Sequence, residues 1–312
     1  MRSVVLLLSI LHLLAWVQAA ADARDIFVSN TAGDDKFTGF SAQSAGDGGG
    51  PVRTIGKALR VAGQGDRVVL DNSGRPYHES VTLEGSHNSG TSLGRFTLAG
   101  NGATLDGSAP VPPRAWENYR GAVFRFRPPH SENQQLFLDD RPASRVIADL
   151  LAGSPPKLEP RQWCQLGGYL YFCVEPTRLP ADYRLSYSSL DTAITLLAVA
   201  KVAIRDLSIQ GFRLDGIQAA NAAHDVAITG IVCRGNGRSG ITVGGASLVD
   251  LDSVSAGDNG LAQVLALPLS EIHLENCKLL SNTAPGLVDR GGKVYLDGKR
   301  IAGGIDSRKA GE

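Results

Sequence analysis

An internal repeat in the C-terminal part of the chain is the feature that most constrains its fold. Residues 192–295 align with themselves so that Val202, Val226, Val249 and Ile272 share one column, which gives steps of 24, 23 and 23 residues. Further apolar columns run through the same alignment: Ile204, Ile228, Leu251 and Leu274; Leu207, Ile231, Val254 and Cys277; and Ile194, Ile217, Ile241, Val264 and Leu287. One repeat of this length cannot bury its apolar residues alone, whereas stacked repeats form a continuous core. The pattern therefore predicts a solenoid.

Two solenoids compete for a repeat of this length, the leucine-rich repeat and the parallel β-helix. Residues 228–236 match the start of a leucine-rich repeat. That repeat then requires a helical or extended segment, whereas residues 240–245 read Gly-Ile-Thr-Val-Gly-Gly and are unsuited to a helix. Each repeat instead offers three short apolar strands separated by polar turns, which predicts a right-handed parallel β-helix. Asn236, Asn259 and Asn282 recur at one turn, where we expect a ladder of hydrogen bonds.

The N-terminus has the pattern of a secretory signal peptide. Arg2 precedes a nearly unbroken apolar run over residues 4–17, and small residues follow as far as Ala21. The alternative, a membrane anchor, needs about 20 apolar residues, more than this run provides. We expect cleavage near Ala19 or Ala21. The mature protein is then secreted, periplasmic or on the cell surface, without insertion into a membrane.

The segment before the repeats contains one amphipathic helix among short strands. Thr54 is a suitable N-cap, and apolar positions follow at helical spacing as Ile55, Ala58, Leu59 and Ala62. A helix at this place fits the closed end of a β-solenoid, where uncovered strands would expose unpaired backbone. We interpret it as an N-terminal capping helix.

Residues 110–187 break the rhythm, because proline is frequent there and most of the aromatic residues gather there. This segment is predicted to be a small inserted antiparallel β subdomain whose aromatics form its core. The domain division is a signal peptide at 1–20, the N-terminal cap and first rungs at 21–109, the insert at 110–187 and the C-terminal rungs at 188–312. Export permits a disulfide between Cys164 and Cys173, whereas Cys233 and Cys277 are expected to be unpaired core residues.

Several stretches resemble the pectate-lyase-like β-helix superfamily. They are Gly-Pro-Val-Arg-Thr-Ile at 50–55, Gly-Asp-Arg-Val at 65–68 and Tyr-His-Glu at 77–79, followed by the repeats of the C-terminal third. The resemblance implies an exported protein that binds or cleaves a polysaccharide, with acidic polysaccharides and lyase-like chemistry favoured. The competing hypothesis is a non-catalytic secreted surface or carbohydrate-binding module. The sequence does not predict an oligomeric state.

Charge and the expected cleft face narrow these hypotheses. The 31 basic and 31 acidic residues give a net charge of zero, which argues against nucleic acid as a partner. On the strand that carries the cleft in this superfamily, the outward positions are expected to be Thr195, Gln218, Thr242, Leu265 and Val288. This face offers no carboxylate, lysine, arginine or histidine, so it is a poor active site.

Candidates for chemistry therefore come mainly from the turns and the neighbouring strand. Asp215 stands where the resemblance to polygalacturonase-type hydrolases implies a catalytic carboxylate, although the next repeat offers Ser239 and the reaction needs two carboxylates. The other catalytic candidates are His224, Arg238 and His273. The candidates for substrate binding are Arg213, Arg234 and Gln218.

Asp252 and Glu275 are the candidates for a metal site. Neighbouring rungs would place these two carboxylates about 5 Å apart on the outer surface. They would repel each other unless a cation bridged them, and the resemblance implies Ca²⁺ as that cation. The competing interpretation is a solvated edge of the sheet without a metal.

Overall fold

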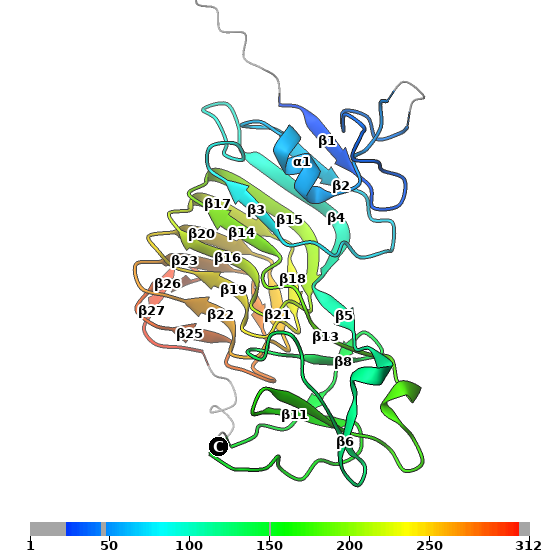
Figure 1. Cartoon of the computed structure of the whole chain (residues 1–312). Coiled ribbons are helices and arrows are strands. Elements are labelled where there is room, and N and C mark those ends of the chain that lie inside the picture. Colours follow the sequence, from blue (N-terminus) through cyan, green and yellow to red (C-terminus); the bar gives the residue numbers. More distant parts are fainter. Residues whose placement is uncertain (1–22, 45–47, 150, 306–312) are drawn as a thin grey trace, which may run out of the picture.

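The computed structural model describes residues 23–44, 48–149 and 151–305, so the predicted signal peptide lies outside it. Within the described residues the protein is mostly β-strand, with an α-helix, α1 (Ile55–Val61), and two short 3₁₀ helices, η1 (Pro113–Ala115) and η2 (Pro180–Asp182). None of these helices has the length and apolar character needed to cross a membrane. The all-β class predicted from the sequence is confirmed (Figure 1).

The largest sheet holds twelve of the described strands. Its main path runs through β1 (Asp25–Val28), β2 (Arg67–Leu70), β4 (Phe96–Asp106), β15 (Ala200–Gln210), β17 (His224–Thr229), β20 (Leu248–Asp252), β23 (Glu271–Glu275), β26 (Lys293–Leu296) and β27 (Lys299–Ile301). The branch beside β15 consists of β18 (Val232–Arg234), β21 (Ser255–Gly257) and β24 (Lys278–Leu279). All of these pairings are parallel except the terminal pair β26–β27.

A second, six-stranded parallel sheet accompanies the first. Its order is β25 (Leu287–Asp289), β22 (Ala262–Ala266), β19 (Ser239–Val243), β16 (Asp215–Asn221), β14 (Ile194–Leu197) and β3 (Val81–Glu84). The registers match the columns predicted from the sequence: Val226 pairs with Val249, and Ile241 pairs with Val264. The 23–24-residue period is therefore the spacing between strands that lie side by side.

A residue with left-handed backbone conformation recurs once per repeat, inside β15 where its register shifts and directly after β17, β20 and β23. Asp206, Gly230, Ser253 and Asn276 all have φ between 51° and 65°. Asp, Asn and Gly tolerate this conformation better than β-branched or bulky residues do. This requirement explains why one column of the repeat is small and polar although its side chains differ.

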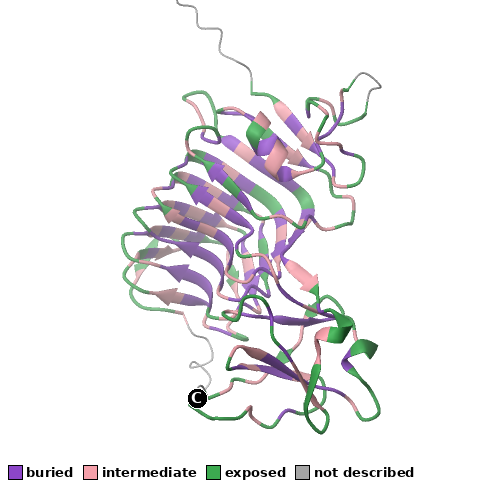
Figure 2. Ribbon diagram, viewed as in Figure 1, coloured by how far each residue is buried: buried purple, intermediate pink, exposed green. Residues whose placement is uncertain are grey.

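The apolar columns meet between the parallel sheets in one continuous core that extends from Ile26 to Val294. Figure 2 shows the alternation of buried and exposed residues along these strands. Ile217, Ile241 and Val264 have no exposed surface. Burying a side chain of this size contributes about 1.5–3 kcal/mol. Stacking the repeats is thus the main source of their stability.

The insert forms two small sheets. One consists of β5 (Ser108–Pro110), β13 (Leu185–Ser188), β8 (Leu136–Leu138) and β9 (Arg141–Pro142), all antiparallel. The other is β10 (Ser144–Arg145), β11 (Gln162–Leu166), β12 (Tyr169–Cys173), β7 (Val123–Phe126) and β6 (Glu117–Arg120), antiparallel except for β10–β11. Trp163 and Phe172 are fully buried in its core, as expected for the aromatics. Cys164 and Cys173 are both buried free thiols.

Helix α1 forms where the sequence predicted it. Thr54 is its N-cap and accepts a hydrogen bond from the backbone N–H of Lys57 at 3.1 Å. The carboxylate of Glu79 accepts the N–H groups of Ile55 and Gly56, both at 3.0 Å. These contacts satisfy donors that the first turn of a helix leaves free. Glu79 belongs to the Tyr-His-Glu stretch, so part of that stretch holds the helix.

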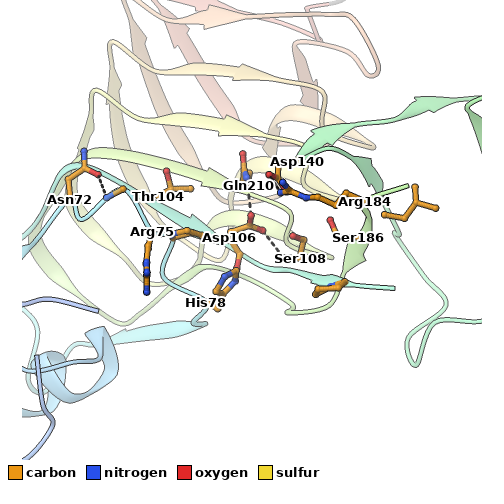
Figure 3. Close-up of a pocket in the computed structure, with 14 residues that line it drawn as sticks. Asn72, Arg75, His78, Thr104, Asp106, Ser108, Asp140, Arg184, Ser186 and Gln210 are labelled. Atoms are coloured by element: carbon orange, nitrogen blue, oxygen red, sulfur yellow. Dashed lines mark hydrogen bonds and ion pairs between the residues drawn. The ribbon is translucent and has the colours of Figure 1, made fainter. Parts of the chain in front are cut away.

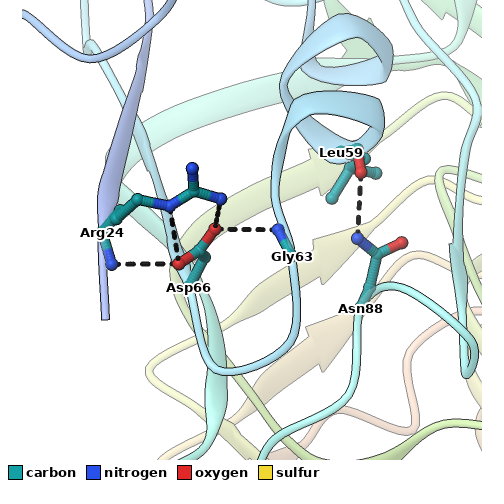
Figure 4. A network of polar contacts seen from close by, with 5 residues as sticks. All are labelled: Arg24, Leu59, Gly63, Asp66 and Asn88. Carbon is teal, nitrogen blue, oxygen red and sulfur yellow. Dashed lines mark hydrogen bonds and ion pairs between the residues drawn. The ribbon is translucent and has the colours of Figure 1, made fainter. Parts of the chain in front are cut away.

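The other end of α1 is held by the network drawn in Figure 4. Asn88 is buried and donates from Nδ2 to the carbonyl oxygen of Leu59 at 3.0 Å. Asp66 accepts the N–H of Gly63 at 2.8 Å and the guanidinium of Arg24 at 2.7 Å. Burial alone would raise the pKa of Asp66, but the hydrogen bonds from Arg24 and Gly63 outweigh it and the pKa is lowered.

The predicted asparagine ladder forms in part. Oδ1 of Asn259 accepts both the backbone N–H and the side-chain amide of Asn236, at 2.9 and 3.0 Å. Nδ2 of Asn259 then donates to Oε1 of Gln263 at 2.7 Å. Asn282 is exposed and pairs instead with Asp258 at 2.8 Å. The expectation for Asn282 was wrong, because the side chain of Gln263, and not that of Asn282, binds the amide of Asn259.

Candidate functional site

A polar cleft of about 510 Å³ lies where the twelve-stranded sheet meets the insert (Figure 3). Its walls come from the loop at residues 72–78, the end of β4 with β5, the end of β15, the β8–β9 turn and the start of β13. No aromatic side chain is among the described residues that line it. Its polar side chains are Asn72, Arg75, His78, Thr104, Asp106, Ser108, Asp140, Arg184, Ser186 and Gln210.

Asp106 is the buried carboxylate of this cleft, with 8% of its surface exposed. It accepts the backbone N–H of Ser108 at 2.8 Å and Nε2 of Gln210 at 2.9 Å. Gln210 lies opposite Asp106 in the pairing of β15 with β4, so the strand register brings the two side chains together. Oε1 of Gln210 accepts Nε of Arg234 at 3.0 Å. One wall of the cleft therefore continues as a row of three polar side chains across neighbouring strands.

His78 presents one ring nitrogen for a ligand. Its Nδ1 lies 2.8 Å from the carbonyl oxygen of Asp106. Because a carbonyl oxygen can only accept, Nδ1 carries the proton in this contact. In the neutral ring Nε2 is then an acceptor, and the described residues give it no hydrogen-bond donor. His78 can accept from a hydroxyl group, or take up a proton there.

Guanidinium groups lie on both sides of the cleft. Arg184 forms an ion pair with Asp140, and both side chains are mostly exposed, at 72% and 64%. An exposed pair of this kind contributes about 0–1 kcal/mol, so a ligand can compete with it. Arg75 is exposed, and its guanidinium has no carboxylate partner among the residues that the structure describes. These cations can bind a carboxylate of a ligand.

Asp215 and Arg238, two catalytic candidates from the sequence, bind each other. Asp215 is fully buried, and its carboxylate accepts Nε of Arg238 at 2.9 Å and the Ser239 hydroxyl at 2.8 Å. The hydroxyl of Thr242 donates to the same carboxylate at 3.0 Å. The hydrogen bond that Arg238 donates to Asp215 raises the pKa of Arg238 more than burial lowers it. With its acceptor sites filled and no exposed surface, Asp215 ties neighbouring repeats together.

The face expected to be an open cleft is closed in its middle. Thr242 has no exposed surface and Leu265 has 2%, although both were expected to point into solvent. Gln218, a candidate for substrate binding on the same face, is half-buried. The expectation of an open groove there was wrong, and the cleft of Figure 3 lies elsewhere, beside β4 and the insert.

His273 and His224 lie outside the cleft. Nδ1 of His273 is 3.0 Å from Asp250 and its Nε2 is 3.3 Å from Glu271. The ring packs edge-on against Tyr295, with the ring centroids 4.9 Å apart. His273 is therefore held by carboxylates on both sides. His224 is exposed at the start of β17 and makes no polar side-chain contact with the part of the chain that is described.

The two arginine candidates differ in their relation to the cleft. Arg213 forms an ion pair with Asp191 at 2.8 Å and does not line the cleft. Arg234 reaches the cleft through its hydrogen bond to Gln210. Of the residues singled out in the sequence for binding or catalysis, Arg234 lies nearest to the cleft. It shares a position in the repeat with Gln210, 24 residues earlier, and this spacing could have pointed to Gln210.

Asp252 and Glu275 are opposite each other in the parallel pair β20–β23, as expected. Asp252 is half-buried and accepts Nδ2 of Asn276 at 2.9 Å, whereas Glu275 is exposed. The described residues contain no group of three or more His, Cys, Asp or Glu side chains placed to hold a metal ion. Ca²⁺ takes six to eight oxygen ligands, so this pair offers only a small part of a calcium shell.

Comparison with known proteins gives a likeness of fold. No protein-family model matches the sequence, and a search of curated proteins gives no match. A solved glycoside hydrolase is similar over 86% of this chain and 74% of its own, with 11% identity and a TM-score of 0.58. XylC, solved in complex with xylose, is similar over 87% of this chain with 13% identity and a TM-score of 0.50. This chain spans only 58% of XylC. At these identities the likeness shows a shared, strand-rich fold.

Proposed function

We propose that the protein is an exported right-handed parallel β-helix that binds a polysaccharide in the cleft of Figure 3. In this proposal α1 caps the first rung, and the insert forms one side of the binding site. Two parallel sheets in register every 23–24 residues support the architecture, and the N-terminal sequence supports export. The likeness to XylC and to a glycoside hydrolase supports a carbohydrate as the ligand.

The cleft itself is the observation that carries the proposal. Sugars are recognised by groups that donate and accept hydrogen bonds, and this cleft offers hydroxyls, amides, an imidazole and guanidinium groups from five segments. Arg75 and Arg184 favour a sugar that carries a carboxylate. The volume of about 510 Å³ suits a short stretch of a chain, and the cleft is open rather than enclosed.

Binding is supported better than cleavage by the state of the carboxylates. Hydrolysis of a glycosidic bond needs one carboxyl group as acid and another as base or nucleophile. Asp106 is already hydrogen-bonded to Ser108 and Gln210, and Asp140 is paired with Arg184. Cleavage is the second candidate, because these carboxylates and His78 line one cleft. In a lyase-like reaction, Nε2 of His78 would remove the proton beside the sugar carboxylate. The electron pair of that C–H bond would form a C=C double bond as the C–O bond to the leaving sugar breaks, and the departing oxygen would take a proton from solvent.

A calcium ion at Asp252 and Glu275 is a separate part of the proposal, and no step of binding depends on it. The two carboxylates have the right chemistry for Ca²⁺ but supply few of its ligands. If Ca²⁺ binds there, it raises the melting temperature of the protein, and the change Glu275→Gln removes this increase. A melting temperature that does not respond to millimolar Ca²⁺ would exclude the site.

Calorimetric titration of the mature protein with uronate and neutral oligosaccharides tests the cleft. Arg75→Met and His78→Gln should each weaken uronate binding about tenfold, the effect of losing one hydrogen bond to a charged group. Arg300→Met, at the exposed end of β27, is the matched control and should leave affinity unchanged. Unaltered affinity in both cleft variants would refute the proposal. New unsaturated-uronate absorbance would show a lyase, and new reducing ends alone a hydrolase.

A further inference from the structure

A second cavity, about 620 Å³ in volume, lies within the insert and away from the cleft of Figure 3. We call it the insert cavity. It is formed by β10, by the β11–β12 hairpin with its turn at Gly167 and Gly168, and by residues 131–133. None of its lining residues also lines the cleft. The two are therefore separate candidate sites that substitutions can address one at a time.

Arg145 is the cation in the lining of the insert cavity, and its hydrogen bonding is incomplete. Its Nε atom is buried and has no hydrogen-bond partner. The guanidinium carbon lies 5.1 Å from the centre of the Trp163 ring, a cation–π contact. No carboxylate within the described ranges forms an ion pair with it. Burial consequently lowers the pKa of Arg145, although the Cys164 thiol beside it acts weakly in the other direction.

Other partly buried arginines of this protein have carboxylate partners. Arg238 binds the buried Asp215, and Arg213, with 13% of its side chain exposed, binds Asp191. A buried guanidinium without a partner loses hydration and gains little in return. An unpaired guanidinium of this kind lowers the stability of the folded protein unless it binds a ligand from solvent. The Trp163 ring contacts the guanidinium on one side, and no carboxylate among the described residues pairs with it.

The other lining groups select among anions. Asn133 supplies a neutral amide, and Ile147 with Ala148 and Leu166 supplies apolar surface against which a sugar ring can pack. Glu132 is the carboxylate of the lining and is exposed. It disfavours a doubly charged phosphate and can accept a hydrogen bond from a hydroxyl group. A singly charged ligand with hydroxyl groups fits this set better than an inorganic anion.

We propose that the insert cavity binds an acidic sugar unit, whose carboxylate is recognised by Arg145. The site is argued from the cavity and from Arg145 alone, whereas the choice of a sugar as the carrier of the carboxylate rests on the proposed function. A polysaccharide with uronate units would then contact the protein at two places, the cleft and the insert cavity. The arginine fork binds a carboxylate through two parallel hydrogen bonds.

The test compares Arg145→Met with Arg127→Met in the full mature protein. Arg127 is a matched control, because its guanidinium also stacks on an aromatic ring, Tyr169 at 5.7 Å, yet it does not line the insert cavity. Titration with trigalacturonate should show about 10–100-fold weaker binding at one site in Arg145→Met and no change in Arg127→Met. A carboxyl-reduced, neutral trisaccharide should bind both variants equally. Unchanged trigalacturonate binding in Arg145→Met overturns the proposal.

Melting temperatures separate a binding role from a structural one. Without ligand, Arg145→Met should melt at the same temperature as the wild type or higher, since an uncompensated charge is removed. A clear decrease would show that Arg145 holds the fold and would overturn the proposal. Ile147→Asp gives an independent arm, because Ile147 is 74% exposed and its replacement cannot disturb a core. It removes apolar surface that both sugars would contact and adds a negative charge, so it should weaken binding of trigalacturonate more than binding of the neutral sugar. An equal loss for the two sugars, or no loss for either, would contradict the site.

Two further arms identify the ligand and the site. If sodium acetate binds as tightly as trigalacturonate and depends on Arg145, the cavity takes a free carboxylate and the sugar part of the proposal is wrong. Loss of uronate binding in Arg75→Met but not in Arg145→Met would leave the cleft as the only site. Loss in Arg145→Met, with unaltered affinity in both Arg75→Met and His78→Gln, would support the insert cavity and refute the proposed function of the cleft.

Discussion

Replacing Asn259 by leucine is the sharpest test of how the repeats are joined. Asn259 has no exposed surface, and leucine has the same number of side-chain heavy atoms branched at the same carbon, so the change removes hydrogen bonds without opening a cavity. It deletes the acceptor of the Asn236 backbone N–H and of the Asn236 amide, and the donor to the Cys233 carbonyl at 3.3 Å. Oε1 of Gln263 still accepts the backbone N–H of Asn259, and Nε2 of Gln263 still donates to the carbonyl oxygen of Ala284 at 3.2 Å.

The magnitude follows from the groups left without partners. Three buried polar groups lose their bond, and each costs about 1–3 kcal/mol when unsatisfied. Partial relaxation of the turn places the expected loss near 4 kcal/mol in the free energy of unfolding. For a chain of this size this corresponds to a decrease of about 6–7 °C in melting temperature. Thermal unfolding followed by circular dichroism measures it directly.

Asn282→Leu is the matched control. Asn282 occupies the same column of the repeat but is exposed and bonded to Asp258, so its replacement should cost less than about 1 kcal/mol. The reasoning would be refuted by equal decreases in melting temperature for the two variants. It would also be refuted by a stable Asn259→Leu, because buried groups would then have found partners that the structure does not contain.

Three other outcomes follow from the structure. Asp66→Asn should lower the free energy of unfolding by about 1–2 kcal/mol at neutral pH. Because the pKa of Asp66 is lowered in the folded protein, its contribution to stability is present above the ordinary value of 3.8 and is lost as the pH falls through the folded value. Urea unfolding curves of the variant and the wild type should therefore converge in acid. Gly237→Ala should destabilise by more than about 3 kcal/mol, because a Cβ atom there would lie 1.7 Å from a carbonyl oxygen of the insert. Gly153→Ala, which meets nothing within 4 Å, should be neutral in the same thermal assay. Cys233, fully buried with its pKa raised by burial, should resist a thiol reagent at pH 8 until the protein unfolds, and rapid labelling would contradict its placement.

The repeat could be predicted from the sequence because one physical requirement fixes it. A strand in the stack places an apolar side chain in the core at the same position of every repeat, so the columns through Val226 and Ile241 gave the registers directly. Helix α1 was predictable from its own segment of sequence, because its N-cap residue and its apolar spacing are both local signals. The register also places Gln210 above Arg234, although this was recognised only in the structure.

The cleft could not be predicted, because it depends on how the insert returns to the sheet. Asp140 lies in the turn between β8 and β9 and Arg184 directly precedes β13, and no period relates them to His78 or Asp106. The mutual burial of Asp215 and Arg238 was hidden for another reason. A sequence column indicates the face of the strand to which a residue belongs, but it does not indicate which group the end of a long side chain contacts.

The pairing of β15 with β4 has a consequence for the order in which the chain folds. Gln210 and Asp106 are 104 residues apart, whereas neighbouring strands within the repeats are separated by 23 or 24. Closing the longer loop costs about 1.3 kcal/mol more in chain entropy, so the repeats can assemble before the N-terminal strands join them. The insert lies between β4 and β15 in the sequence, so the formation of its own antiparallel sheets shortens the loop that has to be closed. Amide protection in a refolding experiment should therefore spread from β20 towards β4, with the cleft completed last.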